Sequence, residues 1–362
     1  MKKHEAREPL FHIVKRAQIP LYQGILIRVA AIVLALLTCA AVFFFLTQKS
    51  PVDFYRSMFN GAFGTERRIW NMAHQMAILL CISLAVTPAF KMRFWNIGAE
   101  GQVLVGGLAC ATIMFYFRQS VPLPLLWVMM TLASILASMV WAIIPAIFKA
   151  NWNTNETLFT LMMNYIATQL VAYFINVWVK SGSGVLNPMP DAGLPKLGNA
   201  WTLNISVVAV LTVILYIYLR FSKHGYEIAV VGESENTARY IGVNVKKVIL
   251  RTMMLSGAIC GVAGLLIVGG TSYTINANSA GGQGFTAIMV SWLAKFNPLL
   301  MILTSFLIAF LQRGTNQVSN DFKMDNSISN IVTAIILFFI IGCEFFINYK
   351  LVFRKPSKED AT

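Results

Sequence analysis

Charged residues are scarce in this chain, and their scarcity sets its class. They make up 12% of the 362 residues, whereas 57% are hydrophobic and the mean hydropathy is +0.65. A soluble protein carries roughly 25% charged residues, which cover its water-facing surface. The composition therefore excludes a soluble enzyme, a disordered chain and a disulfide scaffold. It predicts a polytopic membrane protein.

Motifs of nucleotide, metal and catalytic chemistry are also missing. The chain contains no GxxxxGKS or GxxxxGKT sequence, so no phosphate-binding loop is predicted, and it contains no HExxH motif. Its five cysteines form no CxxC pair and its four histidines are scattered, so neither a zinc site nor a disulfide framework is predicted. We expect no enzymatic activity and no cofactor or metal bound by this chain.

The formal net charge is +14, which in a soluble protein would suggest nucleic acid binding. Here the basic residues lie between apolar runs and form no continuous patch. Membrane topology explains such a distribution better. The predicted partner is therefore the lipid bilayer and not nucleic acid.

Apolar runs of about the length needed to cross a membrane recur along the chain. A spanning helix needs about 20 mostly apolar residues. We predict an all-α fold of about ten transmembrane helices, with eight or nine as alternative counts, and short broken helices near 283–312. The runs lie near 26–46, 72–90, 98–117, 121–148, 157–179, 202–220, 252–272, 283–294, 297–312 and 328–348.

The distribution of Lys and Arg predicts the orientation. With ten spans, the larger share of the 29 basic residues falls on the side of the N-terminus. Basic residues in short loops mark the cytoplasmic side. We therefore expect both termini in the cytoplasm, with 1–25 as an N-terminal segment, 26–350 as the transmembrane domain and 351–362 as a tail.

Two connecting segments are long enough to carry function. Residues 180–201 are rich in Pro and Gly, which break regular structure, so they predict an external loop. Residues 221–250 lie on the cytoplasmic side in this topology. Within them Ser234 is placed to cap a short helix that ends at Gly242. An ordinary solvated connector is the alternative.

Polar residues open the third run. Residues 96–102 read NIGAEGQ, and an ionised Glu at the bilayer centre costs at least ~2.5 kcal/mol. Glu100 must then lie near the interface, be protonated or be paired, with Lys91 and Arg93 as candidate partners. A polar helix start at the interface is the alternative for the segment. Its other distinctive members are Asn96, Gly98, Gly101 and Gln102.

A polar stripe marks the fifth run. Glu156, Thr160, Asn164 and Thr168 recur at every fourth position. Each step of four drifts only about 40° around a helix, so these residues share one face. Such a stripe lines a solute path or forms hydrogen bonds to a neighbouring helix, and the two interpretations are compatible.

A glycine-rich polar stretch precedes the eighth run. Residues 276–284 contain three Gly and two Asn, and a short apolar piece and Asn297-Pro298 follow. Transporters use such a break before a short helix to place backbone dipoles at a substrate site. The alternative is an external loop that leads into an ordinary helix.

From the residues alone, two classes of transporter fit about equally. The permease of an ATP-driven transporter takes its energy from a separate ATPase, which agrees with the missing phosphate-binding loop. An ion-gradient-driven secondary transporter would act alone and would be expected to use intramembrane carboxylates. Few acids lie near membrane depth: Glu100, Glu156 and Glu344. A membrane-embedded enzyme and a pore have less support, because no catalytic cluster or filter-like sequence is visible.

Four segments resemble permease subunits of bacterial ABC importers of the nucleoside and simple-sugar class, within the superfamily of branched-chain amino-acid and ribose permeases. Residues 96–102 are similar to the NIGxEGQ signature of this family, and residues 155–167, 232–242 and 284–298 resemble three further family segments. The resemblance covers about 72–345. Glu235, Thr237 and the bulky stretch 291–295 depart from the usual pattern, which leaves the detailed solute open.

The resemblance implies partners and a cellular place. They are a cytoplasmic ABC ATPase, a second permease subunit in a heterodimer and an extracellular solute-binding lipoprotein, all at the bacterial plasma membrane. Residues 221–250 would then be the loop that couples the chain to the ATPase. The coupling residues implied are Gly232, Asn236, Ala238, Arg239, Tyr240 and Gly242.

The resemblance also implies import by alternating access of a nucleoside or a related sugar-containing solute. A nucleoside has a flat base and a hydroxylated ribose, which aromatic stacking and Asn or Thr hydrogen bonds would suit. We predict that Thr160, Asn164, Phe285 and Thr286 lie along the solute path.

Overall fold

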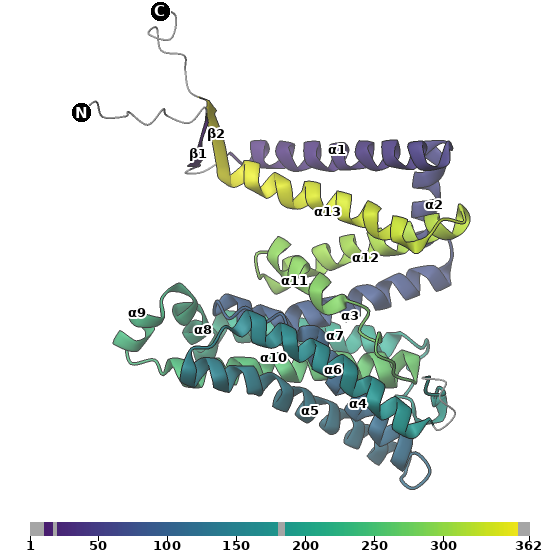
Figure 1. The fold of residues 1–362 in the computed structure, drawn as a ribbon, viewed down its shortest axis with the longest axis vertical. Helices are drawn as coiled ribbons and strands as arrows, with labels where there is room; N and C mark the ends of the chain where they lie inside the picture. Colours follow the sequence, from purple (N-terminus) through teal and green to yellow (C-terminus); the bar gives the residue numbers. More distant parts are fainter. Residues whose placement is uncertain (1–10, 17–19, 180–184, 354–362) are drawn as a thin grey trace, which may run out of the picture. The chain divides into compact units, whose positions relative to one another are not determined.

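The computed structural model describes residues 11–16, 20–179 and 185–353, and α-helices dominate them (Figure 1). The all-α prediction is confirmed. The elements are β1 (Phe11–Lys15), α1 (Leu21–Thr47), α2 (Pro51–Phe63), α3 (Glu66–Lys91), α4 (Ala99–Phe117), α5 (Leu123–Trp152), α6 (Glu156–Trp178), η1 (Pro190–Ala192), α7 (Thr202–Phe221), α8 (Lys223–Glu233), α9 (Glu235–Tyr240), α10 (Val245–Ile267), η2 (Val268–Ser272), α11 (Gln283–Leu293), α12 (Pro298–Asp321), α13 (Asn326–Asn348) and β2 (Tyr349–Phe353).

Among the described residues, nine helices are long and apolar enough to span a membrane: α1, α3, α4, α5, α6, α7, α10, α12 and α13. The eighth predicted run, 283–294, forms α11, which has 11 residues. At a rise of 1.5 Å per residue α11 is about 16 Å long, too short to cross the hydrocarbon core of about 30 Å. The nine candidate spans of the described residues thus fall within the predicted range of eight to ten. Of the two short helices expected near 283–312, α11 is short, whereas 297–312 is part of α12, which has 24 residues.

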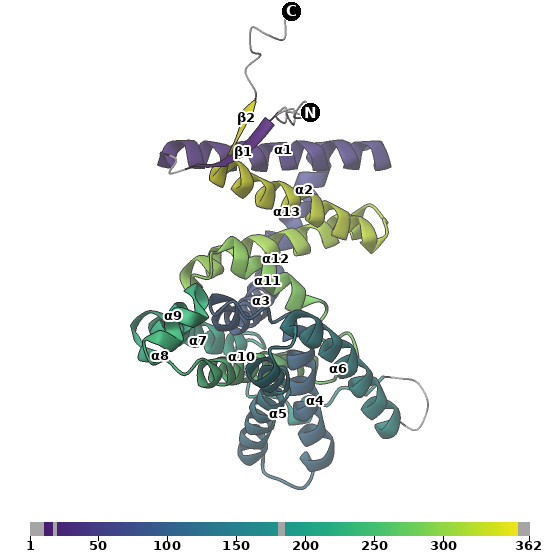
Figure 2. The ribbon, with the colours of Figure 1, turned by 60° about the vertical axis from the view of Figure 1, so that its left-hand side comes forward.

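Residues 65–310 form one compact unit. Its most buried helices are α3 and α10, and α10 packs against α3, α4 and α5 (Figures 1 and 2). Glycines allow this packing, because a Cβ at Gly261 would lie 2.5 Å from the carbonyl oxygen of Ser134 on α5. A Cβ at Gly257 would lie 2.6 Å from the carbonyl oxygen of Ser138. The small-residue spacing of α10 therefore brings two helix backbones into contact.

Residues before 65 and after 310 form the second unit. Within it α1 packs against α13, and the antiparallel strands β1 and β2 pair Phe11 with Phe353 and Lys15 with Tyr349. The strand pair places the two ends of the described chain side by side. Neither this strand pair nor helix α2 was predicted from the sequence.

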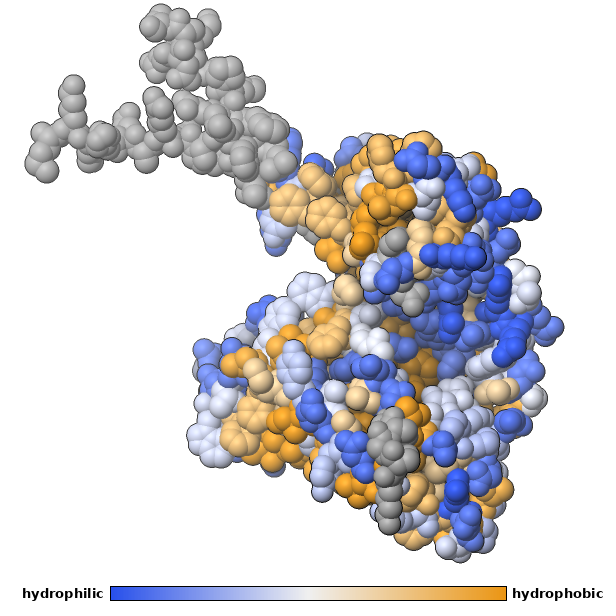
Figure 3. Space-filling model, turned by 45° about the vertical axis from the view of Figure 1, so that its right-hand side comes forward, coloured by the Kyte–Doolittle hydropathy of each residue, from blue (hydrophilic) through white to orange (hydrophobic). Residues whose placement is uncertain are grey.

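Hydrophobic side chains cover much of the visible outer surface (Figure 3). Along α5 the exposed residues include Leu125, Val128, Leu132 and Leu136. In water such a surface would drive aggregation, whereas against lipid tails it is compatible with solubility in the bilayer. The surface thus supports the polytopic membrane protein that the composition predicts.

Candidate functional site

The segment 96–102 is buried where α3, α4 and α10 meet. The side-chain oxygen of Asn96 accepts hydrogen bonds from the backbone N–H of Gly98 (3.0 Å) and from Nε2 of Gln102 (3.3 Å). Its Nδ2 donates to Oγ of Ser256 on α10 (3.2 Å). Asn96 therefore caps the turn that leads into α4 and ties it to the central helix. A side chain at Gly98 would crowd both Asn96 and Thr160.

Glu100 lies in the first turn of α4 and binds the start of α11. The backbone N–H of Gly282 donates to its Oε1 (2.7 Å), and the N–H of Gly284 donates to its Oε2 (2.7 Å). The first turn of a helix has unsatisfied N–H groups and the positive end of the helix dipole, so a carboxylate is the natural partner. Glu100 is thus a paired carboxylate, but its partner is a helix N-terminus and not Lys91 or Arg93.

Two glycines make that contact possible. Gly282 has φ of +73°, in the left-handed region that glycine tolerates best. A Cβ at Gly284 would collide with the backbone nitrogen of Glu100. The polar stretch before the eighth run is therefore neither an ordinary loop nor a regular helix. This non-helical stretch connects η2 to the short helix α11. The N–H groups at the start of α11 donate to the buried carboxylate of Glu100.

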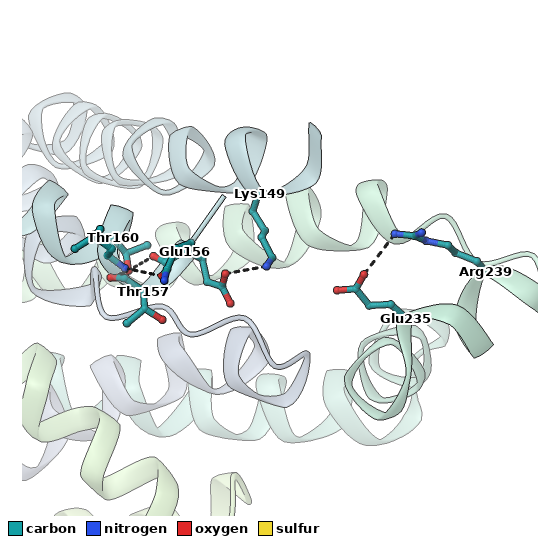
Figure 4. Close-up of polar contacts among 8 residues, drawn as sticks. Lys149, Glu156, Thr157, Thr160, Glu235 and Arg239 are labelled. Atoms are coloured by element: carbon teal, nitrogen blue, oxygen red, sulfur yellow. Dashed lines mark hydrogen bonds and ion pairs between the residues drawn. The ribbon is translucent and has the colours of Figure 1, made fainter. Parts of the chain in front are cut away.

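The polar stripe of α6 supports the same segment from another side. The backbone N–H of Ile97 donates to Oγ1 of Thr160 (3.1 Å), and that hydroxyl in turn donates to the Glu156 carbonyl (2.8 Å; Figure 4). Nδ2 of Asn164 donates to the Ile97 carbonyl (2.9 Å), and its Oδ1 accepts from the N–H of Gly101 (2.8 Å). These bonds confirm the interhelical interpretation of the stripe.

The four predicted path residues thus fall into two pairs, on two helices that both contact segment 96–102. Thr160 and Asn164 are buried on α6, and their polar atoms are bonded within the protein. Phe285 is 43% exposed in the first turn of α11, and the neighbouring Thr286 is half-buried and donates to the Gly282 carbonyl (3.3 Å). A path role remains a prediction for all four, and Phe285 has the most accessible side chain.

The predicted coupling loop contains two short helices, and one of them was expected. Ser234 caps α9, because its Oγ accepts from the N–H of Thr237 (3.2 Å). At the other end the N–H of Gly242, at φ of +85°, donates to the Arg239 carbonyl, and the N–H of Val243 donates to the Ala238 carbonyl. This pair of bonds is a Schellman motif, so the predicted cap and terminator of this helix are confirmed.

The side chains of α9 divide into an inner and an outer set. Ala238 is buried, whereas Asn236 and Arg239 are exposed and Tyr240 is 93% exposed. Arg239 forms an exposed ion pair with Glu235 (3.4 Å; Figure 4), which contributes little stability. The helix therefore presents a polar and aromatic surface to its surroundings.

Helix α8, which the sequence reasoning missed, anchors α9 to the spans. Gly232 lies so close to the carbonyl of Lys91 at the end of α3 that no side chain fits. Arg251 on α10 donates to Glu227 on α8 (2.7 Å), and this bond holds the pKa of the Glu227 carboxyl below its usual range. A charge pair 24 residues apart has no local pattern that would have revealed it.

The chain resembles known transport proteins over most of its length. The sequence pattern of the family described as the permease component of a branched-chain amino acid transport system matches residues 68–341. The glucose ABC transporter permease protein of Haloferax volcanii is 29% identical, covering 88% of this chain and 88% of that one. The guanosine ABC transporter permease protein of Bacillus subtilis is 29% identical, covering 87% and 92%.

A third relative is the nucleoside ABC transporter permease protein of Lactococcus lactis subsp. cremoris. It is 26% identical, and the alignment covers 85% of this chain and 88% of that protein. The alignments with all three relatives thus include most of both chains.

Proposed function

Because the chain belongs to the family of branched-chain amino acid transport system permease components, we propose that it forms the path of an ATP-driven importer for a nucleoside or a related sugar-containing solute. Two of the relatives above are named for guanosine and nucleosides and one for glucose. A ribose or hexose ring is common to these solutes. The proposal therefore takes a sugar-containing solute as the class.

The observation that carries the proposal is the pair α8–α9. It is a locally capped, outward-facing element between two spans, in a chain whose sequence lacks a phosphate-binding loop. A partner that hydrolyses ATP needs a stiff lever on the permease, and α9 has the rigidity and exposure for that role. We assign the coupling contacts to Asn236, Arg239 and Tyr240, with Gly232, Ala238 and Gly242 shaping the element.

The remaining parts of the proposal are the partners and the cycle. A cytoplasmic ABC ATPase, a second permease in a heterodimer and an extracellular solute-binding lipoprotein would complete the importer. ATP binding would close the ATPase, move α8–α9 and rock the two permeases around the path. The half-helix α11 supports this, because transporters place such helix ends at substrate sites.

An ion-gradient-driven secondary transporter finds less support in the described residues. Of the three acids near membrane depth, the structure describes the side chains of Glu100 and Glu156. The first is bound by two backbone amides and the second by Lys149 (2.9 Å). Both carboxylates therefore already have structural partners.

The test is uptake into right-side-out membrane vesicles that contain this chain with the neighbouring subunits of its operon. Radiolabelled guanosine, inosine and glucose are supplied outside, with and without internal ATP. We expect ATP-dependent uptake that persists after an ionophore collapses the ion gradients. Uptake by this chain alone that the ionophore abolishes would refute the proposal. A partner ATPase with its catalytic Glu replaced by Gln is the matched control.

A further inference from the structure

A cavity of about 420 Å³ lies beside the coupling element. It is bounded by the C-terminal end of α3, by the last turn of α8 and by the end of α11, all within the unit 65–310. The basic residues Lys91 and Arg93 place it on the predicted cytoplasmic side. Cavities that hold small-molecule ligands measure about 300–1,000 Å³. Its size therefore suits a nucleoside.

Four aromatic rings form one wall of this cavity, and each contacts two of the others. Phe90 contacts Trp95 (5.6 Å between ring centroids) and stacks on Phe296 (6.0 Å). Trp292 contacts Trp95 (5.4 Å) and Phe296 (6.2 Å). The rings are too close for a ligand to enter between them, so the wall is a packed surface that a flat molecule can only cover from outside.

The two indole rings are the accessible part of the wall. Phe90 is buried, whereas Trp95 is 43% exposed and Trp292 is 50% exposed. Trp292 follows Phe285, a predicted path residue, by two turns of α11, so both lie on the same face of the helix. Two exposed aromatic side chains therefore lie on one face of α11, Phe285 near the end that meets Glu100 and Trp292 at the cavity.

The rim of the cavity is polar and carries both signs of charge. Lys91 and Arg93 line it from α3 and the turn that follows, and Glu233 lines it from α8. The turn is held in place, because the N–H groups of Arg93 and Phe94 donate to the carbonyls of Phe90 and Ala89. Two cations disfavour a cationic ligand, whereas donors and an acceptor beside indole faces suit a neutral heteroaromatic ring.

We propose that this cavity binds the flat base of the transported solute on the cytoplasmic side, as its last binding site before release. The proposal rests on the proposed import function. The base would stack on Trp95 and Trp292, with its polar edge toward Lys91, Arg93 and Glu233. Because Gly232 and Glu233 belong to α8, a bound solute touches the coupling element and two other elements at once. Release is then linked to movement of α8.

The experiment uses the complete importer in inverted membrane vesicles, whose cytoplasmic face is outside. Photoreactive 8-azidoguanosine is added, the vesicles are irradiated, and the labelled peptides are identified by mass spectrometry. We expect the label in the peptides that contain residues 90–95 and 292–296, and we expect unlabelled guanosine to compete. Stacking on aromatic side chains contributes enough affinity that removing one ring reduces labelling at least about fivefold.

The variants are Trp95→Leu and Trp292→Leu, with Trp292→Phe as the conservative form that restores most of the labelling. Trp152→Leu is the matched control, because Trp152 is 66% exposed at the end of α5 and lies outside the cavity. Labelling that survives both Leu substitutions would show that these tryptophans only anchor the protein at the membrane interface. That result overturns the proposal, as does a label found elsewhere.

A second experiment distinguishes the two possible sources of the base, a nucleoside and a nucleotide. Photoreactive 8-azido-GMP is compared with 8-azidoguanosine, and labelling by the nucleotide alone overturns the proposal. ATP-driven uptake is measured in right-side-out vesicles prepared from the same cells. Wild-type uptake without Trp292-dependent labelling refutes the cytoplasmic site but leaves the import function standing. Absence of ATP-driven uptake in the wild type refutes the import function itself.

Discussion

The segment 96–102 and the helix α9 are held in place in opposite ways. Distant groups hold the buried segment: Ser256 from α10, Asn164 from α6 and the N-terminus of α11. Residues within a few positions hold α9: Ser234 at its start and the Gly242 turn at its end. The comparison shows that segment 96–102 depends on tertiary contacts, whereas α9 carries its own stabilising signals.

Removal of the Glu100 carboxylate should have the largest effect. Glu100→Ala leaves two N–H groups at the start of α11 without partners, and hydrogen bonds to a charged group contribute about 1.5–3 kcal/mol each. We expect a loss of about 3 kcal/mol in unfolding free energy and loss of uptake. Thermal unfolding of the protein in lipid nanodiscs measures the first effect.

Two variants serve as controls for Glu100. Glu100→Gln keeps an acceptor oxygen and should fall between Glu100→Ala and the wild type. Glu235→Ala removes a carboxylate from the exposed ion pair with Arg239, so it should cost about 1 kcal/mol or less. An unfolding temperature of the Glu100→Ala protein equal to that of the wild type would contradict the assigned contact between Glu100 and the start of α11.

The second prediction concerns Asn164, the bridge from α6. Asn164→Leu leaves the N–H of Gly101 and the carbonyl of Ile97 unpaired in the interior, so we expect a loss of about 2 kcal/mol. Thr168→Val is the control, because the Thr168 hydroxyl bonds only to a carbonyl of its own helix. If Asn164→Leu keeps its stability but loses uptake, Asn164 acts on the solute and not on the helix packing.

The third prediction concerns the local cap of α9. Ser234→Ala should increase the opening of α9 by about 1 kcal/mol, the usual cost of a lost N-cap. Hydrogen exchange of the α9 amides measures this opening, while the global unfolding temperature stays unchanged. Ser222→Ala removes the equivalent cap of α8, which packs on α3 and α10. Equal acceleration in both helices would mean that α9 has further tertiary support.

The smallest effect on stability is expected at the exposed face of α9. Arg239→Ala with Tyr240→Ala should change unfolding by no more than about 0.5 kcal/mol, because surface substitutions away from special contacts rarely do more. The same variant should hydrolyse ATP without transport. Simultaneous measurement of phosphate release and uptake tests this. Tyr226→Ala, on the exposed side of α8, is the control, and full coupling in the double variant would make α9 a plain connector.

Local sequence signals predicted most of the helices of this fold but few of the contacts between them. Hydrophobic run length was sufficient to predict the nine candidate spans of the described residues, and the eighth run, which forms α11, already stood out as short. Ser234 and Gly242 predicted α9, because a cap and a terminator act within one helix. The sequence indicated that Glu100 needs a partner and offered the nearby Lys91 and Arg93. The actual partners are the backbone N–H groups of Gly282 and Gly284.

The sequence by itself determined the class, the approximate spans and the capped helix of the coupling loop, because hydropathy and capping act over a few turns of chain. Tertiary structure alone decided that Glu100 meets a helix start 182 residues later. It also decided that β1 pairs with β2, and that four aromatic rings from two distant segments form one wall. The reason is physical: a buried polar or aromatic group is satisfied by whichever group folding brings within reach, and no local pattern specifies that group.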